Sequence, residues 1–354
     1  MRFVVCGAGA IGGVAGARLH QAGHDVTLIA RGAHYHAISR NGLTLETPDE
    51  REVLRIAAVA DPGAIDWRPE HVILLATKTQ DSAAALDALA RAAPAATPVV
   101  CVQNGVENER LALRRFANVY AAVVMAPTAH LEPGVVQAYG TELTGVIDLG
   151  RYPSGVDQRA RAIAGVLGGA RFSSLVRPDI MRFKYAKLLA NLANAVDAAC
   201  GPDPGADAPD TGADQLVARV REEGRKVLRA AGIEFTAEDA DDIWARWTRL
   251  GVRPIGGRKR AGSSTWQSLE RGSGVETDYL NGEIVLLGRL HRARTCCGGG
   301  SSGSRRRAGV CGIRRRACRR RPRGNGAGPR ARAGHRPGDR PASRATPRAA
   351  APTG

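Results

Sequence analysis

The first stretch of the chain, up to Ala30, constrains the fold more than any other. An apolar run over residues 3–6 leads into the glycine pattern G-x-G-x-x-G, and a segment of helical spacing follows over residues 11–21. A second apolar run covers residues 24–30. A strand, a glycine turn, a helix and a strand in this order are typical of a unit that binds a dinucleotide. The glycines of the pattern are Gly7, Gly9 and Gly12.

Each glycine has its own expected role. Gly7 permits the tight turn, Gly9 lets the backbone approach a pyrophosphate, and Gly12 lets the helix pack closely. The free N–H groups at the start of the helix, around Ala10 and Ile11, attract phosphate groups. We therefore expect all five residues to bind the cofactor.

The residue after the second strand indicates which dinucleotide is bound. Units that bind NAD usually place Asp or Glu there, because a carboxylate accepts hydrogen bonds from the ribose hydroxyls. This chain has Arg31, whose guanidinium cannot accept those bonds but pairs well with a 2′-phosphate. The position favours NADP over NAD; the alternative is a solvated arginine.

Strands and helices continue to alternate after this unit. Apolar runs at residues 71–76, 97–102 and 119–125 are separated by helical spacing at residues 82–92 and 107–116. The alternation predicts an α/β fold with a Rossmann-type, doubly wound parallel sheet. Ligands on such sheets bind beyond the carboxyl ends of the strands, so the residues just past those ends should share one rim. They are Arg31, Lys78 and Asn104.

Three segments interrupt this alternation. We interpret the residues directly after Arg31 as a polar loop. Residues 42–47 and 53–59 alternate like a small hairpin, and residues 131–150 have the pattern of short strands and turns.

Beyond residue 158 the pattern becomes helical. Six predicted helices without an intervening strand are typical of a separate all-α domain. We expect a dinucleotide-binding domain over residues 1–165 and a helical, substrate-binding and catalytic domain over residues 166–291. The predicted helices cover residues 158–167, 179–200, 215–231, 237–250, 265–271 and 277–290.

The second of these helices carries a polar stripe. Its members, at about 100° per residue, fall within a sector of roughly 80°. A plain amphipathic helix with a solvated face would show the same spacing, but asparagine is a poor helix former, so the stripe favours a polar cleft. Its residues are Lys184, Lys187, Asn191 and Asn194.

Together these motifs resemble the ketopantoate reductase (2-dehydropantoate 2-reductase) family over residues 1–291. The family implies NADPH-dependent reduction of a 2-oxo acid in a cleft between a Rossmann domain and a helical domain. The matching pieces are the glycine turn, Arg31, Thr77-Lys78-Thr79-Gln80, Gln103-Asn104-Gly105, Lys187-Leu-Leu-Ala-Asn191, Ser263-Ser264 and Glu276-Thr-Asp-Tyr-Leu-Asn-Gly282.

The resemblance implies two catalytic residues. Lys187 matches the general acid that protonates the ketone oxygen, and Glu276 matches a carboxylate that holds the substrate's hydroxyl. The expected substrate-binding residues are Asn104, Asn191, Asn194 and Ser264. The expected cofactor-binding residues are Gly7, Gly9, Ala10, Ile11, Gly12, Arg31, Lys78 and Asn104.

Several of these residues also have structural alternatives. Ser264 with Gln267 forms a capping box. Glu276 would also complement the dipole of the following helix, and Lys78 would also suit a solvated position. Lys184 matches no family role, and we interpret it as structural.

Two departures from the family concern the substrate. The family's second helix asparagine would fall at Ala195, whereas the chain has Asn194, and only Ser268 stands where an acidic residue often follows the Ser-Ser turn. The resemblance implies reduction of 2-dehydropantoate to pantoate in pantothenate biosynthesis. The alternatives are another 2-oxo acid, or an NADP-binding protein impaired by loss of its C-terminal helix.

The chain changes character after His291. Residues 292–354 hold 18 arginines, no lysine and one acidic residue, and they therefore carry the whole net charge of +17. They have no apolar periodicity, which predicts disorder. We interpret this tail as the product of a frameshift. The alternative is a genuine arm that binds nucleic acid, although the tail has no aromatic residue for stacking.

Other classes of protein find little support in the sequence. No apolar run is long enough to cross a membrane, and the chain begins directly with a strand, which leaves no room for a signal peptide. The cysteines of the body lack metal-site spacing. We expect a cytoplasmic enzyme with a small-molecule substrate and without membrane or metal partners, and a homodimer stays open.

Overall fold

The computed structural model describes residues 1–200, 212–235, 238–260, 262–270 and 272–293. The arginine-rich tail, interpreted above as frameshifted and disordered, lies outside the described residues from position 294 onward.

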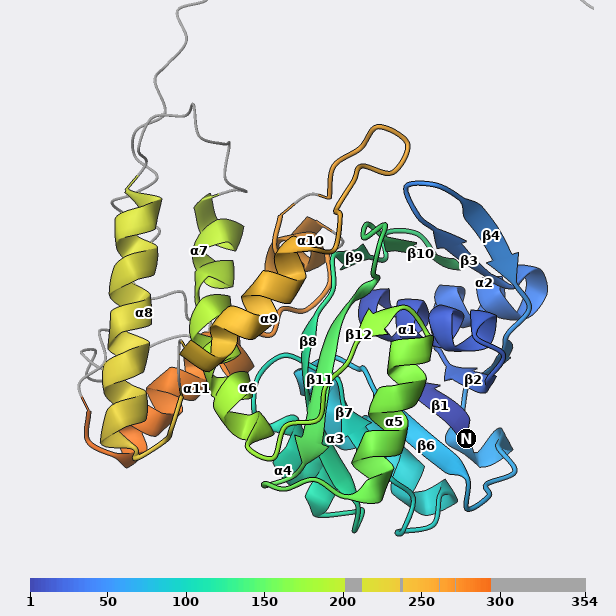
Figure 1. Cartoon of the computed structure of the whole chain (residues 1–354), viewed down its shortest axis with the longest axis horizontal. Coiled ribbons are helices and arrows are strands. Elements are labelled where there is room, and N and C mark those ends of the chain that lie inside the picture. Colours follow the sequence, from blue (N-terminus) through green and yellow to red (C-terminus); the bar gives the residue numbers. More distant parts are fainter. Residues whose placement is uncertain (201–211, 236–237, 261, 271, 294–354) are drawn as a thin grey trace, which may run out of the picture. The chain divides into compact units, whose positions relative to one another are not determined.

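An eight-stranded sheet forms the centre of the N-terminal part (Figure 1). Its order is β12-β11-β8-β7-β6-β1-β2-β5, in which the run from β8 to β5 is parallel and β11 is antiparallel to β8. This confirms the predicted doubly wound sheet. The strands are β1 (Arg2–Cys6), β2 (Asp25–Ile29), β5 (Ala57–Val59), β6 (His71–Leu75), β7 (Val99–Cys101), β8 (Val119–Met125), β11 (Gly145–Arg151) and β12 (Phe172–Ser173).

Both faces of this sheet are buried, which explains why its strands are continuous apolar runs. On one face, Leu19 and Leu167 contribute to a core with the central strands. On the other face, Leu86 and Phe116 pack against Ile73. The helices around the sheet are α1 (Ala10–Gln21), α2 (Gly32–Asn41), α3 (Thr79–Ala92), α4 (Asn108–Leu113) and α5 (Gln158–Gly169).

A four-stranded sheet packs on the α1 side, in the order β4-β3-β10-β9. The predicted hairpin is half correct, because β3 and β4 pair antiparallel but β5 leaves them to extend the main sheet beside β2. The strands are β3 (Leu43–Glu46), β4 (Arg51–Leu54), β9 (Thr128–Ala129) and β10 (Val135–Ala138).

The polar loop expected after Arg31 is wrong, since this segment forms α2. Ile38 is buried in the main core, and Tyr35 packs against it from a partly buried position. Gly42, with a φ of 86°, ends the helix. Ile38 and Tyr35 are the residues by which α2 joins this core, so its amphipathic pattern is too weak to read from the sequence.

The C-terminal part is helical and packs through α6 and α9 against β8 and β11 (Figure 1). Two expectations fail here. The short strand β12 separates α5 from the later helices and pairs with β11, so the helical run is interrupted and the sheet extends past residue 165. The helix predicted over residues 179–200 breaks at Leu192. The helices are α6 (Ile180–Asn191), α7 (Ala193–Cys200), α8 (Ala213–Ala230), α9 (Glu238–Thr248), α10 (Ser264–Glu270) and α11 (Thr277–Leu290).

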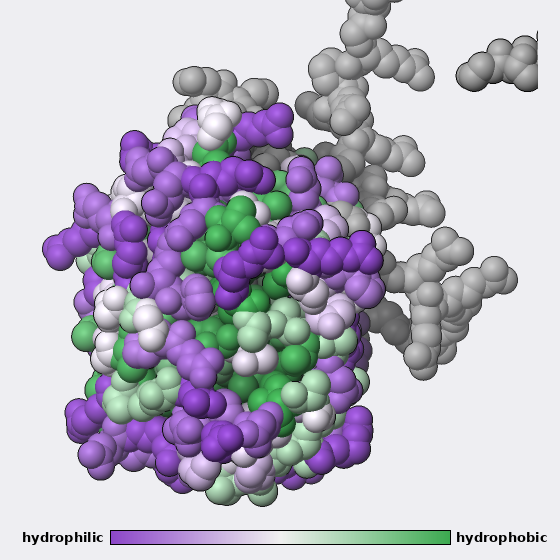
Figure 2. Space-filling view, turned by 90° about the vertical axis from the view of Figure 1, so that its right-hand side faces the viewer, coloured by the Kyte–Doolittle hydropathy of each residue, from purple (hydrophilic) through white to green (hydrophobic). Residues whose placement is uncertain are grey.

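The side of the molecule that carries α2, β2 and β4 has apolar residues in the middle of its surface, ringed by polar ones (Figure 2). On β4, the side chain of Val53 is 50% exposed. Surfaces of this kind often contact another molecule. The homodimer stays a prediction.

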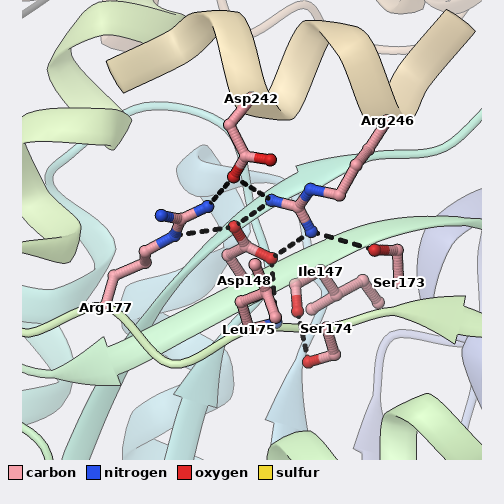
Figure 3. A network of polar contacts seen from close by, with 8 residues as sticks. All are labelled: Ile147, Asp148, Ser173, Ser174, Leu175, Arg177, Asp242 and Arg246. Atoms are coloured by element: carbon pink, nitrogen blue, oxygen red, sulfur yellow. Dashed lines mark hydrogen bonds and ion pairs between the residues drawn. The ribbon is translucent and has the colours of Figure 1, made fainter.

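A buried ionic network joins α9 to the sheet (Figure 3). Asp148 of β11 is fully buried and accepts hydrogen bonds from Arg177 Nε, at 3.1 Å, and from Arg246 Nη1, at 2.9 Å. Both arginines also pair with Asp242 of α9, and Arg246 donates to Ser173 Oγ at 2.9 Å. A carboxylate this deep in the fold is stable because two guanidinium groups surround it.

We predict that Asp148→Asn lowers the free energy of unfolding by about 3–5 kcal/mol, because it keeps the side-chain volume but leaves two partly buried guanidinium groups facing each other. Urea denaturation measures this change.

The matched control is Asp66→Asn, which removes the exposed partner of Arg68. This substitution should change the free energy of unfolding by about 0–1 kcal/mol. Equal effects from the two variants would contradict the role assigned to the network.

Candidate active site

The glycine turn has the geometry that the sequence pattern predicts. Gly7 has a φ of 101°, and a Cβ there would lie 2.8 Å from Thr77 N. A Cβ on Gly12 would lie 2.1 Å from the carbonyl oxygen of Gly7, so α1 packs on this turn only without a side chain. The space beside Gly9 is open, because a Cβ there would still lie 3.9 Å from His130 Nδ1, its nearest neighbour among the described residues. An open backbone before the first turn of α1 fits a pyrophosphate.

The residues predicted to share one rim do follow the carboxyl ends of neighbouring parallel strands. Arg31 follows β2, Lys78 comes soon after β6, and Asn104 comes soon after β7. Arg31 is exposed at the N-cap of α2 and makes no ion pair with the described residues. A guanidinium in this position suits a phosphate ligand.

His34 of α2 supports the glycine turn, and the sequence analysis missed it. Its Nδ1 accepts a hydrogen bond from Gly134 N at 2.8 Å, so in the neutral ring Nε2 donates to the carbonyl oxygen of Ala8 at 2.7 Å. Burial lowers the pKa of His34, which favours this neutral ring. The contact spans 100 residues of sequence, and no local pattern announces it.

Lys187 lies on α6. It lines a small cavity together with Asn104 and Lys184. Burial, and secondly the charge of Lys184, lower the pKa of Lys187 to about 7. A lysine with this pKa can donate and recover a proton near neutral pH.

The polar stripe is split by the helix break at Leu192. Asn191 ends α6, and its Nδ2 is buried without a hydrogen-bond partner among the described residues. Asn194 lies on α7, partly buried, and Asn281 of α11 donates to the carbonyl oxygen of Leu192 at 3.1 Å. A buried unpaired amide costs free energy unless a ligand satisfies it, which singles out Asn191.

Glu276 and Lys78 lie in one cluster of contacts, although the sequence assigned them to different ligands. Glu276 Oε1 accepts hydrogen bonds from N and Oγ1 of Thr79, both at 2.9 Å, at the start of α3. Lys78 Nζ donates to the carbonyl oxygen of Gly274 at 2.6 Å and to Ser268 Oγ at 3.0 Å. The loop between α10 and α11 is thereby fastened to the end of β6, and the carboxylate of Glu276 caps α3 rather than its own helix.

The cap of α10 differs from the capping box considered for Ser264. Trp266 N donates to Ser263 Oγ at 3.3 Å, so Ser263 is the capping residue. Ser264 is the first residue of the helix and is partly buried. Its hydroxyl is therefore not needed as a cap.

The fold and the site define a class. A Rossmann-type sheet with an open glycine turn, together with a lysine of lowered pKa beside the loop after β7, is the arrangement of an oxidoreductase that uses a nicotinamide dinucleotide. A family model described as ketopantoate reductase PanE/ApbA matches residues 3–154, and the model of its C-terminal part matches residues 179–296. The chain belongs to the ketopantoate reductase family and is an oxidoreductase of the 2-dehydropantoate 2-reductase type.

Individual relatives agree with this family. The 2-dehydropantoate 2-reductase of Mesorhizobium japonicum is 30% identical over 314 residues, covering 82% of this chain and 92% of the relative. That of Pyrococcus horikoshii is 28% identical over 316 residues, covering 85% and 100%. A PanE/ApbA family ketopantoate reductase from Ralstonia eutropha has a TM-score of 0.64 at 30% identity, covering 82% and 92%.

One neighbour in fold has a different name. A D-mandelate dehydrogenase, solved with NADH and anilino(oxo)acetate, has a TM-score of 0.69 at 23% identity, covering 83% of this chain and 94% of that one. Among the described residues, no helix is long and apolar enough to cross a bilayer, and no group of three or more His, Cys, Asp or Glu is placed to hold a metal ion.

We predict that His34→Ala weakens nucleotide binding about tenfold, because the glycine turn loses its link to Gly134. In the wild type, acid should have a similar effect, since protonation turns Nδ1 from an acceptor into a donor facing Gly134 N–H. Because the pKa of His34 is lowered, binding should hold at neutral pH and weaken only as the pH falls below the ordinary histidine range. Titration with NADPH and NADH, followed by nicotinamide fluorescence, measures both effects.

His36→Ala on the exposed side of the same helix is the control and should bind nucleotide as the wild type does. Equal affinities in His34→Ala and His36→Ala would show that the glycine turn does not need the imidazole.

Proposed function

We propose that the protein is an NADPH-dependent reductase that converts a 2-oxo acid to a 2-hydroxy acid, with 2-dehydropantoate as its first candidate substrate and pantoate as the product. One observation carries the proposal: Lys187, with its lowered pKa, shares a cavity with Asn104 at the carboxyl edge of the sheet. There a carbonyl group can meet both a proton donor and a nicotinamide.

A bound nicotinamide dinucleotide would supply the hydride. Lys187 stabilises the negative charge that develops on the carbonyl oxygen and then transfers its proton to that oxygen. Its pKa of about 7 makes the ammonium group a stronger acid than an ordinary lysine while leaving part of it protonated at neutral pH.

Amide and carboxylate groups on the helical side would orient the substrate. The unpaired Nδ2 of Asn191 is suited to an oxygen of the substrate's carboxylate. Glu276 uses Oε1 for Thr79, and we assign its Oε2 to the substrate's hydroxyl group. Asn194 and Ser264 are further candidates on the same side, and Asn104 would contact both substrate and nicotinamide.

The cofactor-binding assignments follow the glycine turn and the rim. Gly7, Gly9 and Gly12, with the N–H groups of Ala10 and Ile11, would hold the pyrophosphate. Arg31 would pair with the 2′-phosphate. Lys78 comes three residues after the end of β6, on the same rim, and is a further candidate for binding the cofactor. Its ammonium group also fastens the loop between α10 and α11.

We predict that Lys187→Met lowers kcat about 10²- to 10⁴-fold with ketopantoate and leaves NADPH affinity unchanged, because it removes the proton donor but no group at the glycine turn. In the wild type, kcat should fall as the pH rises through about 7, since only protonated Lys187 is active. NADPH oxidation, followed by absorbance over a pH series, measures both. Full turnover in Lys187→Met would refute the assignment.

We predict that Arg31→Gln raises the Kd for NADPH about 10- to 100-fold and leaves the Kd for NADH unchanged, because only NADPH carries the 2′-phosphate. Arg40→Gln, at the other end of α2, is the control and should alter neither constant. If Arg31→Gln weakens both nucleotides equally, the guanidinium does not select NADPH.

The substrate itself is open to a second candidate. Ala195 and Ser268 stand where the family often has an amide and an acidic group, and Ser268 is already engaged by Lys78. A different 2-oxo acid is therefore the runner-up, and kcat/KM over a panel of 2-oxo acids separates the two. Binding of NADPH without turnover on any member of the panel would favour the impaired enzyme instead.

A further inference from the structure

Lys184 is a buried charge for which the proposed mechanism has no use. Only 4% of the residue is exposed. Its Nζ lies 2.5 Å from Glu109 Oε1 of α4, and it donates a hydrogen bond to the carbonyl oxygen of Gln103 at 3.0 Å. Glu109 is itself fully buried. An ammonium group this deep in the protein needs such a partner, because desolvation of an unpaired charge is very costly.

These two contacts connect α6, which carries Lys187, to α4 and to the loop that carries Asn104. Lys184 and Lys187 are neighbours on α6, one turn apart. Gln103 immediately precedes Asn104 in the loop between β7 and α4. The hydrogen bond from Lys184 to Gln103 therefore sets how closely Lys187 approaches Asn104, and all four residues line the same cavity.

We propose that Lys184 is a positioning residue, which fixes Lys187 against Asn104 and keeps a second positive charge behind the proton donor. The inference rests on the proposed function where it gives Lys187 that role. It changes the interpretation made from the sequence, in which Lys184 was structural.

Among the charged groups around α6, Lys184 is the one that affects the pKa of Lys187. After burial, the charge of Lys184 is the second cause that lowers the pKa of Lys187. Lys184 itself has Glu109 as its ion-pair partner. Burial raises the pKa of the nearby Cys101 well above the usual range, so that thiol is uncharged.

Several of the other charged groups on the elements packed against α6 have partners of their own. Asp148 of β11 and Asp242 of α9 pair with Arg177 and Arg246. Asp197 of α7 accepts from Ser263 N, and Arg221 of α8 donates to the carbonyl oxygen of Ala190. β8 contributes apolar residues and Tyr120, whose pKa burial raises to about 12.

The test measures the titration of Lys187 without relying on turnover. Lys187 is acetylated with acetic anhydride over a pH series, and mass spectrometry gives the midpoint of its reactivity. Lys184→Met should raise that midpoint by about one pH unit, because a like charge is removed. The same variant should lower kcat about tenfold and leave the Kd for NADPH unchanged, a loss that reflects misplacement of Lys187.

Two further variants separate charge from folding. Lys184→Arg keeps the charge and should hold the midpoint near that of the wild type. Lys184→Met combined with Glu109→Met leaves no unpaired carboxylate, so it should fold, and its midpoint should also rise. Lys226→Met, on the exposed side of α8, is the control and should change neither the midpoint nor kcat.

An unchanged midpoint in Lys184→Met and in the double variant, with normal NADPH binding as proof of folding, would overturn the inference. A raised midpoint in Lys184→Met, combined with a wild-type protein that reduces no 2-oxo acid, would sustain the inference and defeat the proposed function. Normal turnover in Lys187→Met would likewise defeat the proposed function alone.

Discussion

The candidate site depends on two lysines on one face of α6, of which Lys184 is buried and Lys187 partly buried. Among the described residues, Lys184 alone of the two has a carboxylate at its ammonium group, that of Glu109. Lys187 instead lines a cavity, and burial together with the charge of Lys184 lowers its pKa to about 7. The same desolvation that would be a defect in a structural helix gives Lys187 a pKa suited to its proposed role as an acid near neutral pH. Glu109 is therefore as important as the lysines, since without it the helix would bring two unpaired charges into the interior.

Polar contacts at three places fasten the helical part to the sheet. Lys184 reaches the loop after β7, the loop before α11 reaches the start of α3 through Glu276, and Asp148 holds α9 through Arg246. Apolar packing supports them, since Ile180 and Phe183 belong to a core shared with β8. Polar bonds have defined directions, whereas apolar contacts tolerate sliding. The three contacts consequently hold the helical part against the sheet in a defined position, which suits a reaction that needs close approach of two groups.

Local patterns in the sequence predicted the features that local sterics dictate. The glycine turn, each strand and helix of the alternation, and each residue that follows β2, β6 or β7 can be recognised from residues close to it in the sequence. The features that were missed depend on distant partners: β12 exists because β11 is beside it, and α2 is held by Ile38 and by the contacts of His34. Lys184 and Glu109 belong to this second kind, because a lysine on a polar stripe looks solvated until its partner on another helix is known.

The position of the helix α11 bears on whether the arginine-rich tail disables the site. Its inner face, with Leu280 and Ile284, closes the core that α6 and α8 share, whereas Leu286 and Leu290 on its outer face are 45% and 66% exposed. A further helix of the family would have this outer face to cover. That face does not line the cavity of Lys187, which is formed by α6, β8 and the loop after β7. Under the frameshift hypothesis, the loss of that helix removes apolar burial from α11 and lowers stability, while the proposed proton donor Lys187 and the pair of Lys184 with Glu109 keep every contact described above.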